Sequence, residues 1–178
     1  MGAVSVADLA ELIRDIPDFP EPGIVFKDIT PLLADPTGLD AAVSVLADRW
    51  RDAAVDAVVG IEARGYILGA PVARELGVGF IPVRKAGKLP GSTVRKQYGL
   101  EYGADTIEMH DDAVAPGDRI LILDDVLATG GTAAAAAELV AEQGATLVGF
   151  SFLIELGFLA GRDKLGDATI DSVIEVGG

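Results

Sequence analysis

The residues best suited to chemistry follow a short apolar run in the second half of the chain. Four apolar residues at 120–123 predict a buried parallel strand, and the carboxylates of Asp124 and Asp125 end it. A loop with two glycines and two threonines comes next, and residues 133–140 are typical of a helix. Ligands of open α/β sheets bind at the carboxyl ends of strands. This segment therefore puts acids, hydroxyls and backbone N–H groups where a ligand would lie.

The loop after the two carboxylates suits an anion. Gly130 and Gly131 allow a left-handed backbone and a close approach to a bulky group, and Thr132 opens a helix whose N-terminus favours phosphate. Asp124 and Asp125 suit sugar hydroxyls or a divalent cation instead. A phosphorylated ribose satisfies both halves. No lysine follows the glycines, which excludes a Walker A motif; taken alone, the residues would also fit an acidic turn that Thr132 simply caps.

Size and composition limit the class of protein. The 178 residues, half of them hydrophobic, suffice for one α/β domain over residues 1–178. The net charge of −14 argues against nucleic-acid or anionic-membrane partners, and the lack of cysteine excludes disulfides and Cys zinc sites. We find no signal-peptide pattern and no apolar run near the roughly 20 residues of a membrane span. We therefore expect a cytoplasmic protein.

A basic island interrupts this acidic chain. Residues 76–100 contain no Asp or Glu but hold five cations, namely Arg84, Lys85, Lys88, Arg95 and Lys96. The glycines, proline and serine within residues 87–93 disfavour a helix or a central strand. Long loops in compact domains are often active-site lids. We expect a flexible loop over residues 84–103 that meets an anion; the alternative is a solvated loop whose charges have no partner.

Strand and helix signals alternate along the chain. This alternation predicts an open, mostly parallel sheet with helices on both faces. The expected strands span residues 55–61, 78–83, 120–123, 146–154 and 170–176, with a hairpin at 98–102 and 106–110. The expected helices begin at Ser5, which forms a capping box with Asp8, at Thr37, at Ile67 and at the loop glycines. Residues 24–30 are expected to be extended, and Trp50 to lie in the core.

Four segments together resemble a known family. Residues 120–132 resemble the phosphoribosyl-pyrophosphate (PRPP) motif of the type I phosphoribosyltransferases. Three more segments resemble the adenine phosphoribosyltransferase branch of that family. Residues 13–33 are similar to its N-terminal segment and residues 60–69 to its pyrophosphate loop. Residues 84–91 with 100–103 are similar to its flexible loop and hood strand. The resemblance runs to Lys164. It implies the type I fold with an N-terminal helix and hood segment at 1–33.

The resemblance implies a purine salvage enzyme, a glycosyltransferase that moves phosphoribose from PRPP to adenine and forms AMP and pyrophosphate. It implies Mg²⁺ bound with PRPP, near Asp124 and Asp125 and without direct protein ligands, and it implies a homodimer. In this fold the pyrophosphate loop often contains a non-proline cis peptide, which we expect at Glu62–Ala63.

The resemblance also assigns residues. It gives catalytic roles to Arg64, Glu101, Asp124 and Asp125, with Glu101 accepting the proton of the base and the two aspartates holding the ribose hydroxyls. It places the PRPP phosphates on Arg64, Arg84, Lys88, Tyr102, Ala128, Thr129, Gly130, Gly131 and Thr132. It places adenine between Phe26 and Leu156, read by backbone groups of Val25 and Lys27. Glu101 also fits a surface ion pair, and Phe26 also fits plain core.

Two other functions stay open. One is transfer to a 6-oxopurine (hypoxanthine, guanine or xanthine), but relatives of that type place a lysine near the 6-oxygen and residues 146–156 contain none. The other is a PRPP-sensing regulator, which the strong acidity and the lack of an added nucleic-acid-binding domain disfavour.

Overall fold

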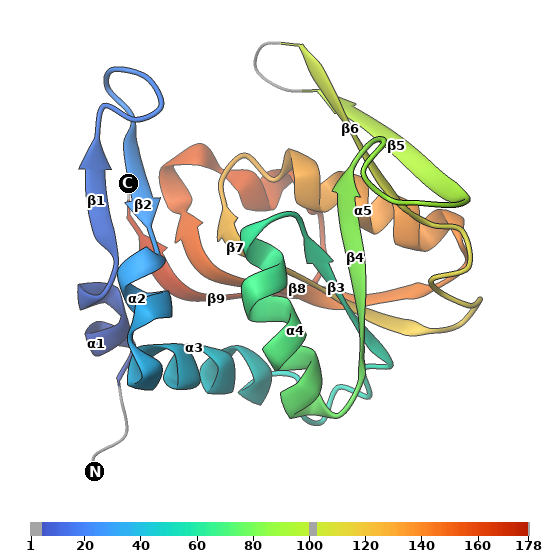
Figure 1. Ribbon diagram of the computed structural model, residues 1–178, viewed down its shortest axis with the longest axis horizontal. Helices are drawn as coiled ribbons and strands as arrows, with labels where there is room; N and C mark the ends of the chain where they lie inside the picture. The colour runs from blue at the N-terminus through green and yellow to red at the C-terminus, as the bar shows by residue number, and fades with distance from the viewer. Residues whose placement is uncertain (1–4, 100–102, 178) are drawn as a thin grey trace.

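A seven-stranded sheet forms the centre of the molecule (Figure 1). The computed structural model describes residues 5–99 and 103–177. The strand order is β5-β6-β4-β3-β7-β8-β9. The strands are β3 (Ala57–Ile61), β4 (Gly79–Lys85), β5 (Thr93–Gly99), β6 (Ala104–His110), β7 (Arg119–Leu127), β8 (Thr146–Leu156) and β9 (Ile170–Val176). Strands β4, β3, β7, β8 and β9 are parallel and β5 and β6 are antiparallel, so the mostly parallel sheet is confirmed.

Helices cover both faces of the sheet, as predicted (Figure 1). One face carries α1 (Val6–Glu11), α2 (Thr30–Ala34), α3 (Pro36–Asp48) and α4 (Arg64–Leu76), and the other carries α5 (Gly131–Glu142). In β7, Ile120 and Ile122 pack toward α5, whereas Leu121 and Leu123 pack toward α3 and α4. This two-sided burial explains the unbroken apolar run. Trp50 is buried in the core, as expected.

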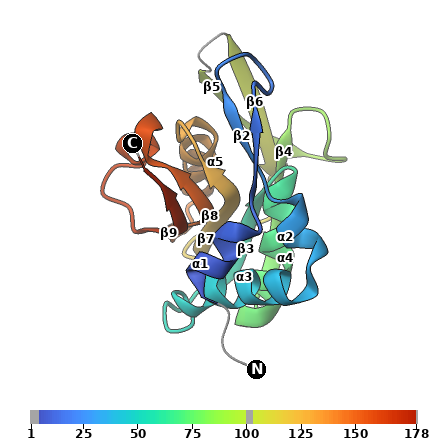
Figure 2. The ribbon, with the colours of Figure 1, turned by 90° about the vertical axis from the view of Figure 1, so that its left-hand side faces the viewer.

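A small antiparallel hairpin of β1 (Arg14–Pro17) and β2 (Val25–Asp28) forms a separate sheet, which stands apart from the main one in Figure 1 and faces the viewer in Figure 2. The extended segment predicted at 24–30 is confirmed only over Val25–Asp28, which form β2, because Thr30 begins α2. Strand β1 and helix α2 were not predicted. The capping box of Ser5 and Asp8 is confirmed. The predicted start of α3 at Thr37 is wrong, because the side chain of Asp35 accepts a hydrogen bond from the Gly38 amide at 2.6 Å and caps the helix.

Two boundaries near the cleft also differ from the prediction. Strand β7 continues past the carboxylates to Leu127, because Asp124 and Val126 keep their pairing with β8. Helix α4 begins at Arg64 rather than Ile67. Asp124, Asp125 and Arg64 therefore lie on regular elements, which fixes their positions more firmly than a loop would.

The predicted long loop over residues 84–103 is mostly wrong. Strand β4 reaches Lys85 and residues 93–99 form β5, so that 86–92 is the connecting loop in the described part of this segment. Residues 100–102 lie outside the described residues. None of the helices in residues 5–99 and 103–177 has the length and apolar character needed to cross a bilayer.

Candidate active site

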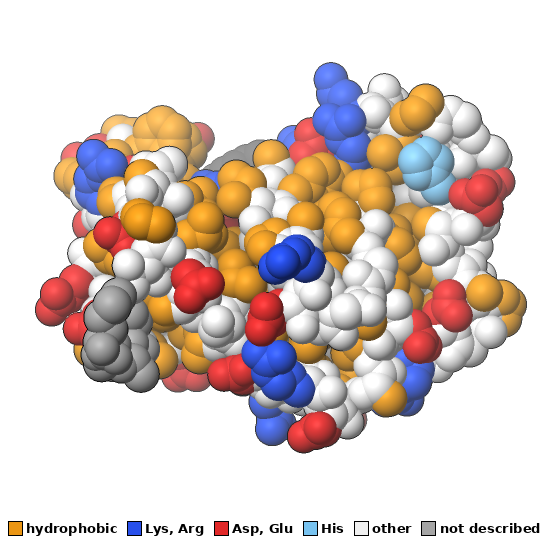
Figure 3. All heavy atoms as spheres, turned by 60° about the horizontal axis from the view of Figure 1, so that its bottom comes forward, with side chains coloured by type: hydrophobic (Ala, Val, Ile, Leu, Met, Phe, Trp, Pro, Cys, Tyr) orange, Lys and Arg blue, Asp and Glu red, His pale blue; other side chains and the backbone are white. Residues whose placement is uncertain are grey.

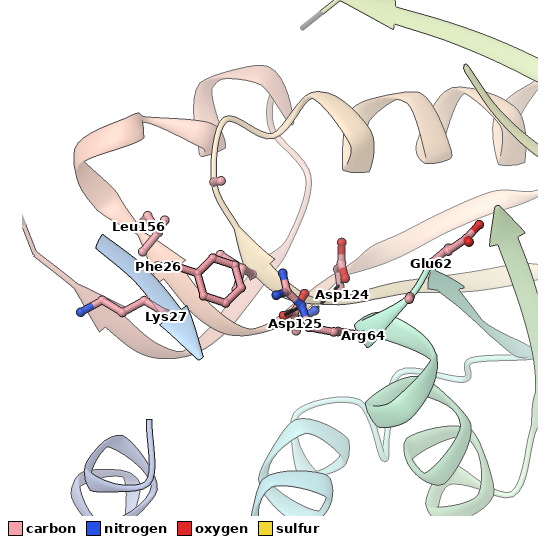
Figure 4. Close-up of a pocket in the computed structure, with 10 residues that line it drawn as sticks. Phe26, Lys27, Glu62, Arg64, Asp124, Asp125 and Leu156 are labelled. Carbon is pink, nitrogen blue, oxygen red and sulfur yellow. Dashed lines mark hydrogen bonds and ion pairs between the residues drawn. The ribbon is translucent and has the colours of Figure 1, made fainter. Parts of the chain in front are cut away.

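A cleft opens at the carboxyl ends of β3 and β7 (Figure 4). It encloses a cavity of about 500 Å³ and brings together many of the predicted residues. Its lining consists of Phe26, Lys27, Glu62, Ala63, Arg64, Asp124, Asp125, Val126, Ala128 and Leu156. A smaller hollow of about 80 Å³ continues from it along residues 126–133 and shares Asp124 and Ala128 with it. The predicted acids, loop and apolar wall therefore form one connected site.

Asp124 and Asp125 lie at the floor of the cleft (Figure 4). The Asp125 amide donates to Oδ1 of Asp124 at 2.8 Å, and Nε of Arg64 lies 2.5 Å from Oδ2 of Asp125. Burial, and then the charge of Asp125, raises the pKa of Asp124 well above its usual range. Close packing against Asp124 requires glycine at position 65, since a Cβ at Gly65 would lie 2.9 Å from Oδ1 of Asp124. The pair is thus poised to meet a cation or hydrogen-bond donors.

The β7–α5 loop, residues 128–130, lies beside the acids. Gly130 takes a left-handed φ of +78° and is the N-cap of α5, and none of the described side chains caps this helix. Thr132, expected as the first helical residue, is the second, and its hydroxyl donates to the hydroxyl of Tyr98 at 3.2 Å. The positive end of the α5 dipole and its first N–H groups therefore face the hollow. This geometry favours an anion.

An apolar wall closes the other end of the cleft. The rings of Phe26 and Phe19 meet edge to face at 5.3 Å, and the Arg64 guanidinium carbon lies 4.9 Å from the centre of the Phe26 ring. Leu156 lies near Phe26, whereas the Lys27 side chain points away from the cavity (Figure 4) and pairs with Asp15 at 2.6 Å. Val25 is 47% exposed and lines a neighbouring groove instead of the cavity. The wall is thus apolar, with Arg64 at its edge.

Most cations of the basic island form ion pairs with carboxylates of the same chain. Arg84 pairs with Glu62, with Nε–Oε2 and Nη2–Oε1 distances of 3.2 and 3.3 Å, and its hydrogen bonds lower the pKa of Glu62. The other pairs are Lys85 with Asp105, Arg95 with Glu108, and Lys96 with Glu138 and Glu142. Basic and acidic side chains also lie next to each other on the face drawn in Figure 3. Among the described residues, Lys88 has no carboxylate within ion-pair distance.

Arg84 nevertheless lies close to the acids. A cavity of about 310 Å³ joins it to Asp124, Thr132 and Tyr98, and Glu62 and Lys85 are among its other lining residues. Lys88 approaches through its backbone, whose carbonyl oxygen accepts from Nη1 of Arg84 at 3.0 Å. The expected cis peptide at Glu62–Ala63 is confirmed. Glu101 and Tyr102 lie outside the described residues.

The sequence reasoning missed Glu62 and Tyr98 as lining residues. Glu62 directly follows β3, so the rule that selected Asp124, a polar group at the carboxyl end of a strand, also selects it. The position of Tyr98 depends on the pairing of β5 with β6, which places its side chain against α5. No pattern in the neighbouring residues predicts that contact.

Comparison with known proteins agrees with this geometry. Residues 29–174 match the model of the phosphoribosyl transferase domain, and the chain belongs to that family. Its similar relatives share one more specific name. It is 57% identical to the adenine phosphoribosyltransferase of Thermobifida fusca over 92% of this chain and 93% of that protein. The expected resemblance is thereby confirmed.

Solved structures with the same fold carry the same name. The adenine phosphoribosyltransferase of Thermoanaerobacter pseudethanolicus superposes with a TM-score of 0.95 at 48% identity, over 97% of this chain and all of that one. The enzyme of Giardia lamblia, complexed with 9-deazaadenine, gives a TM-score of 0.92 at 44% identity, over 98% and 99% of the two chains.

Proposed function

We propose that this chain is a purine salvage enzyme that transfers the phosphoribosyl group of PRPP to adenine, forming AMP and releasing pyrophosphate. The observation that carries the proposal is one cleft in which an apolar wall, a pair of acids and a helix N-terminus follow one another. Base, ribose and 5′-phosphate follow one another in the same order in a nucleotide. The shared name of the relatives supports adenine as the base.

The binding half of the proposal assigns three subsites. The 5′-phosphate binds the N–H groups of the β7–α5 loop and the start of α5, with hydroxyls of Thr129 and Thr132. The ribose hydroxyls bind Asp124 and Asp125, where hydroxyl donors stabilise the ionised form that burial disfavours. Adenine lies between Phe26 and Leu156, with its edge read by the backbone of β2.

In the reaction, the bond between the anomeric carbon and the pyrophosphate oxygen breaks, and its electron pair leaves with the pyrophosphate. The acids stabilise the positive charge that develops on the ribose, and the cations Arg64, Arg84 and Lys88 neutralise the leaving group. N9 of adenine forms the new bond to the anomeric carbon and loses a proton. Glu101 is the proposed acceptor of that proton.

Magnesium bound with PRPP is part of the proposal. In the described residues no group of three or more His, Cys, Asp or Glu side chains is placed to hold a metal. Mg²⁺ is usually bound by one or two carboxylates together with substrate phosphates. Asp124 and Asp125 line the cleft and would lie near an ion carried by PRPP, while Oδ2 of Asp125 stays paired with Arg64. When bound, the ion would neutralise charge on the phosphates.

The cavity favours a 6-amino over a 6-oxo purine. A 6-oxygen calls for a cationic donor, but Nζ of Lys27 is engaged by Asp15 and its side chain points out of the cavity (Figure 4). Arg64, the other cation in the lining, is held by Asp125. A buried polar group of a ligand that finds no partner costs about 1–3 kcal/mol, so a 6-oxopurine should bind less well than adenine.

A panel of bases tests the function. The purified protein is incubated with PRPP and Mg²⁺ and with adenine, hypoxanthine, guanine or xanthine, and the nucleotide formed is quantified. We expect AMP alone. IMP or GMP as the main product would overturn the adenine assignment and keep the transferase. PRPP binding without any nucleotide product would favour the PRPP-sensing regulator. Omission of Mg²⁺ tests the metal, and sedimentation velocity tests the proposed homodimer.

A further inference from the structure

An ion pair between a buried carboxylate and a half-exposed guanidinium lies at the end of β8. Glu155 is 6% exposed and precedes Leu156, and Arg162 belongs to the 3₁₀ turn η2 (Gly161–Lys164). The guanidinium meets the carboxylate with two parallel contacts, from Nε to Oε1 and from Nη2 to Oε2, both 2.6 Å long. This two-pronged geometry fixes the orientation of both groups. The hydrogen bonds of Arg162 lower the pKa of Glu155.

The residue before Arg162 lies directly against the β7–α5 loop. A Cβ added at Gly130 would overlap the carbonyl oxygen of Gly161, and a Cβ added at Gly161 would overlap the carbonyl oxygen of Ala128. The η2 turn and α5 are in contact, and Figure 1 shows the segment after β8 beside the β7–α5 connection. Backbone thus packs on backbone, and a shift of the turn must move the loop.

The ion pair therefore links two strands to one loop. Glu155 faces Leu127 of β7 in register, and Leu127 leads directly into Ala128. On its other side Arg162 lies 3.5 Å from the Ile170 carbonyl oxygen and 3.5 Å from the Ser172 hydroxyl, both on β9. The guanidinium consequently ties the turn to two neighbouring strands at the level of the cleft.

We propose that Glu155 and Arg162 are positioning residues for the 5′-phosphate: their ion pair holds the Gly161 peptide against the β7–α5 loop and so sets the loop geometry that binds the phosphoribosyl donor. This inference rests on the proposed function, since it needs a phosphate on that loop. Neither side chain lines the cavity. They act through the position of Ala128 and Gly130.

The test compares donor and base affinity in the intact protein. Arg162→Lys keeps the charge but loses the two-pronged contact, and Gly161→Ala pushes the loop from the same side without touching the ion pair. We expect each variant to raise the KM for PRPP and the Kd for ribose 5-phosphate about tenfold, because small displacements at a binding site have large effects. The KM for adenine should change less than about twofold in the same variants.

The matched control is Arg51→Lys. Arg51 bridges Asp48 and Glu75 on the far helices α3 and α4, much as Arg162 lies 2.6 Å from Glu155 and 3.7 Å from Glu175. This control should leave both KM values unchanged. Thermal unfolding checks that every variant is folded, and Glu155→Gln, which keeps the shape of the side chain, should repeat the Arg162→Lys result. Equal rises in both KM values, or an unchanged PRPP KM with a lowered melting temperature alone, would overturn the inference. Absence of AMP from the unaltered protein would instead refute the proposed function.

Discussion

The β7–α5 loop and the basic segment from Arg84 to Lys96 both favour an anion, but they are built differently. The loop offers backbone N–H groups and a helix dipole, and its shape is fixed by backbone packing against Gly161. The basic segment offers five cations, and carboxylates from other segments already hold all of them except Lys88 among the described residues. A phosphate can therefore bind a prepared loop, whereas an anion that approaches Arg84 must compete with Glu62. Under the proposed function, the loop would be a fixed anion site and the basic segment an exchangeable one.

The largest effect is expected from Gly130→Ala. Alanine is strained at the left-handed φ of +78° that Gly130 adopts, and its Cβ would overlap the carbonyl oxygen of Gly161. The loop must therefore move. We expect kcat/KM for PRPP to fall about 100-fold. Gly77→Ala is the matched control, because Gly77 has a φ of +73° with open space around it. If both variants lost activity equally, backbone strain rather than loop position would be responsible.

The second prediction concerns the anchor of the basic segment, Glu108. This fully buried carboxylate accepts from the amides of Lys88 and Leu89 at 2.9 and 2.8 Å and pairs with Arg95. Although burial acts in the opposite direction, these hydrogen bonds and the charge of Arg95 lower its pKa to about 2. Glu108→Gln should lower the free energy of unfolding at pH 7 by about 1–3 kcal/mol.

The pH dependence of this loss has a defined sign. The folded pKa lies below the ordinary value of 4.5, so the stabilisation is present above that value and is lost as the pH falls toward about 2. Urea unfolding should therefore show a difference between the unaltered protein and Glu108→Gln that shrinks over this window. Glu142→Gln, which alters an exposed pair with Lys96, is the control. A constant difference down to pH 2 would contradict the prediction.

The same contrast explains what the sequence allowed us to predict. The acids, the loop and the start of α5 are contiguous, so their types and order predict the geometry of the site. The partners of Arg84 and Arg95 lie 22 and 13 residues away in the chain, and only strand pairing brings them together. Glycines correctly predicted a turn near residue 90, but the alternating exposure along β5 shows that a strand signal was overlooked.

Strand ends were hard to predict for a related reason. Hydrophobicity stops at Leu123, but the backbone pairing of β7 continues through the acids to Leu127. Polar residues at a binding site interrupt the apolar pattern without ending the strand. The positions where the pattern fails are therefore those of the proposed site.

A smaller effect is expected from Glu62→Gln, which tests whether the basic segment is exchangeable. The neutral amide holds Arg84 less strongly, so the arginine becomes available to the pyrophosphate. We expect the KM for PRPP to fall about two- to fivefold, since partly exposed ion pairs are weak. Glu138→Gln removes a carboxylate from Lys96, outside the cavities described above, and should change nothing. A rise in KM would mean that Glu62 positions Arg84 instead of restraining it.

The smallest effect is expected where the two regions meet, at the hydrogen bond from Thr132 to Tyr98. Tyr98→Phe keeps the ring, which lies 3.5 Å from a Cβ position at Gly131, and removes only the acceptor. One neutral hydrogen bond is worth about 0.5–1.5 kcal/mol, and this one is long at 3.2 Å, so the KM for PRPP should rise only about twofold. Tyr66→Phe is the control, since its hydroxyl donates to the Val83 carbonyl at 2.8 Å. That variant should lower stability but not donor affinity. If Tyr98→Phe left the KM unchanged, the fixed loop would hold its shape without the basic segment, and the two anion sites would act independently.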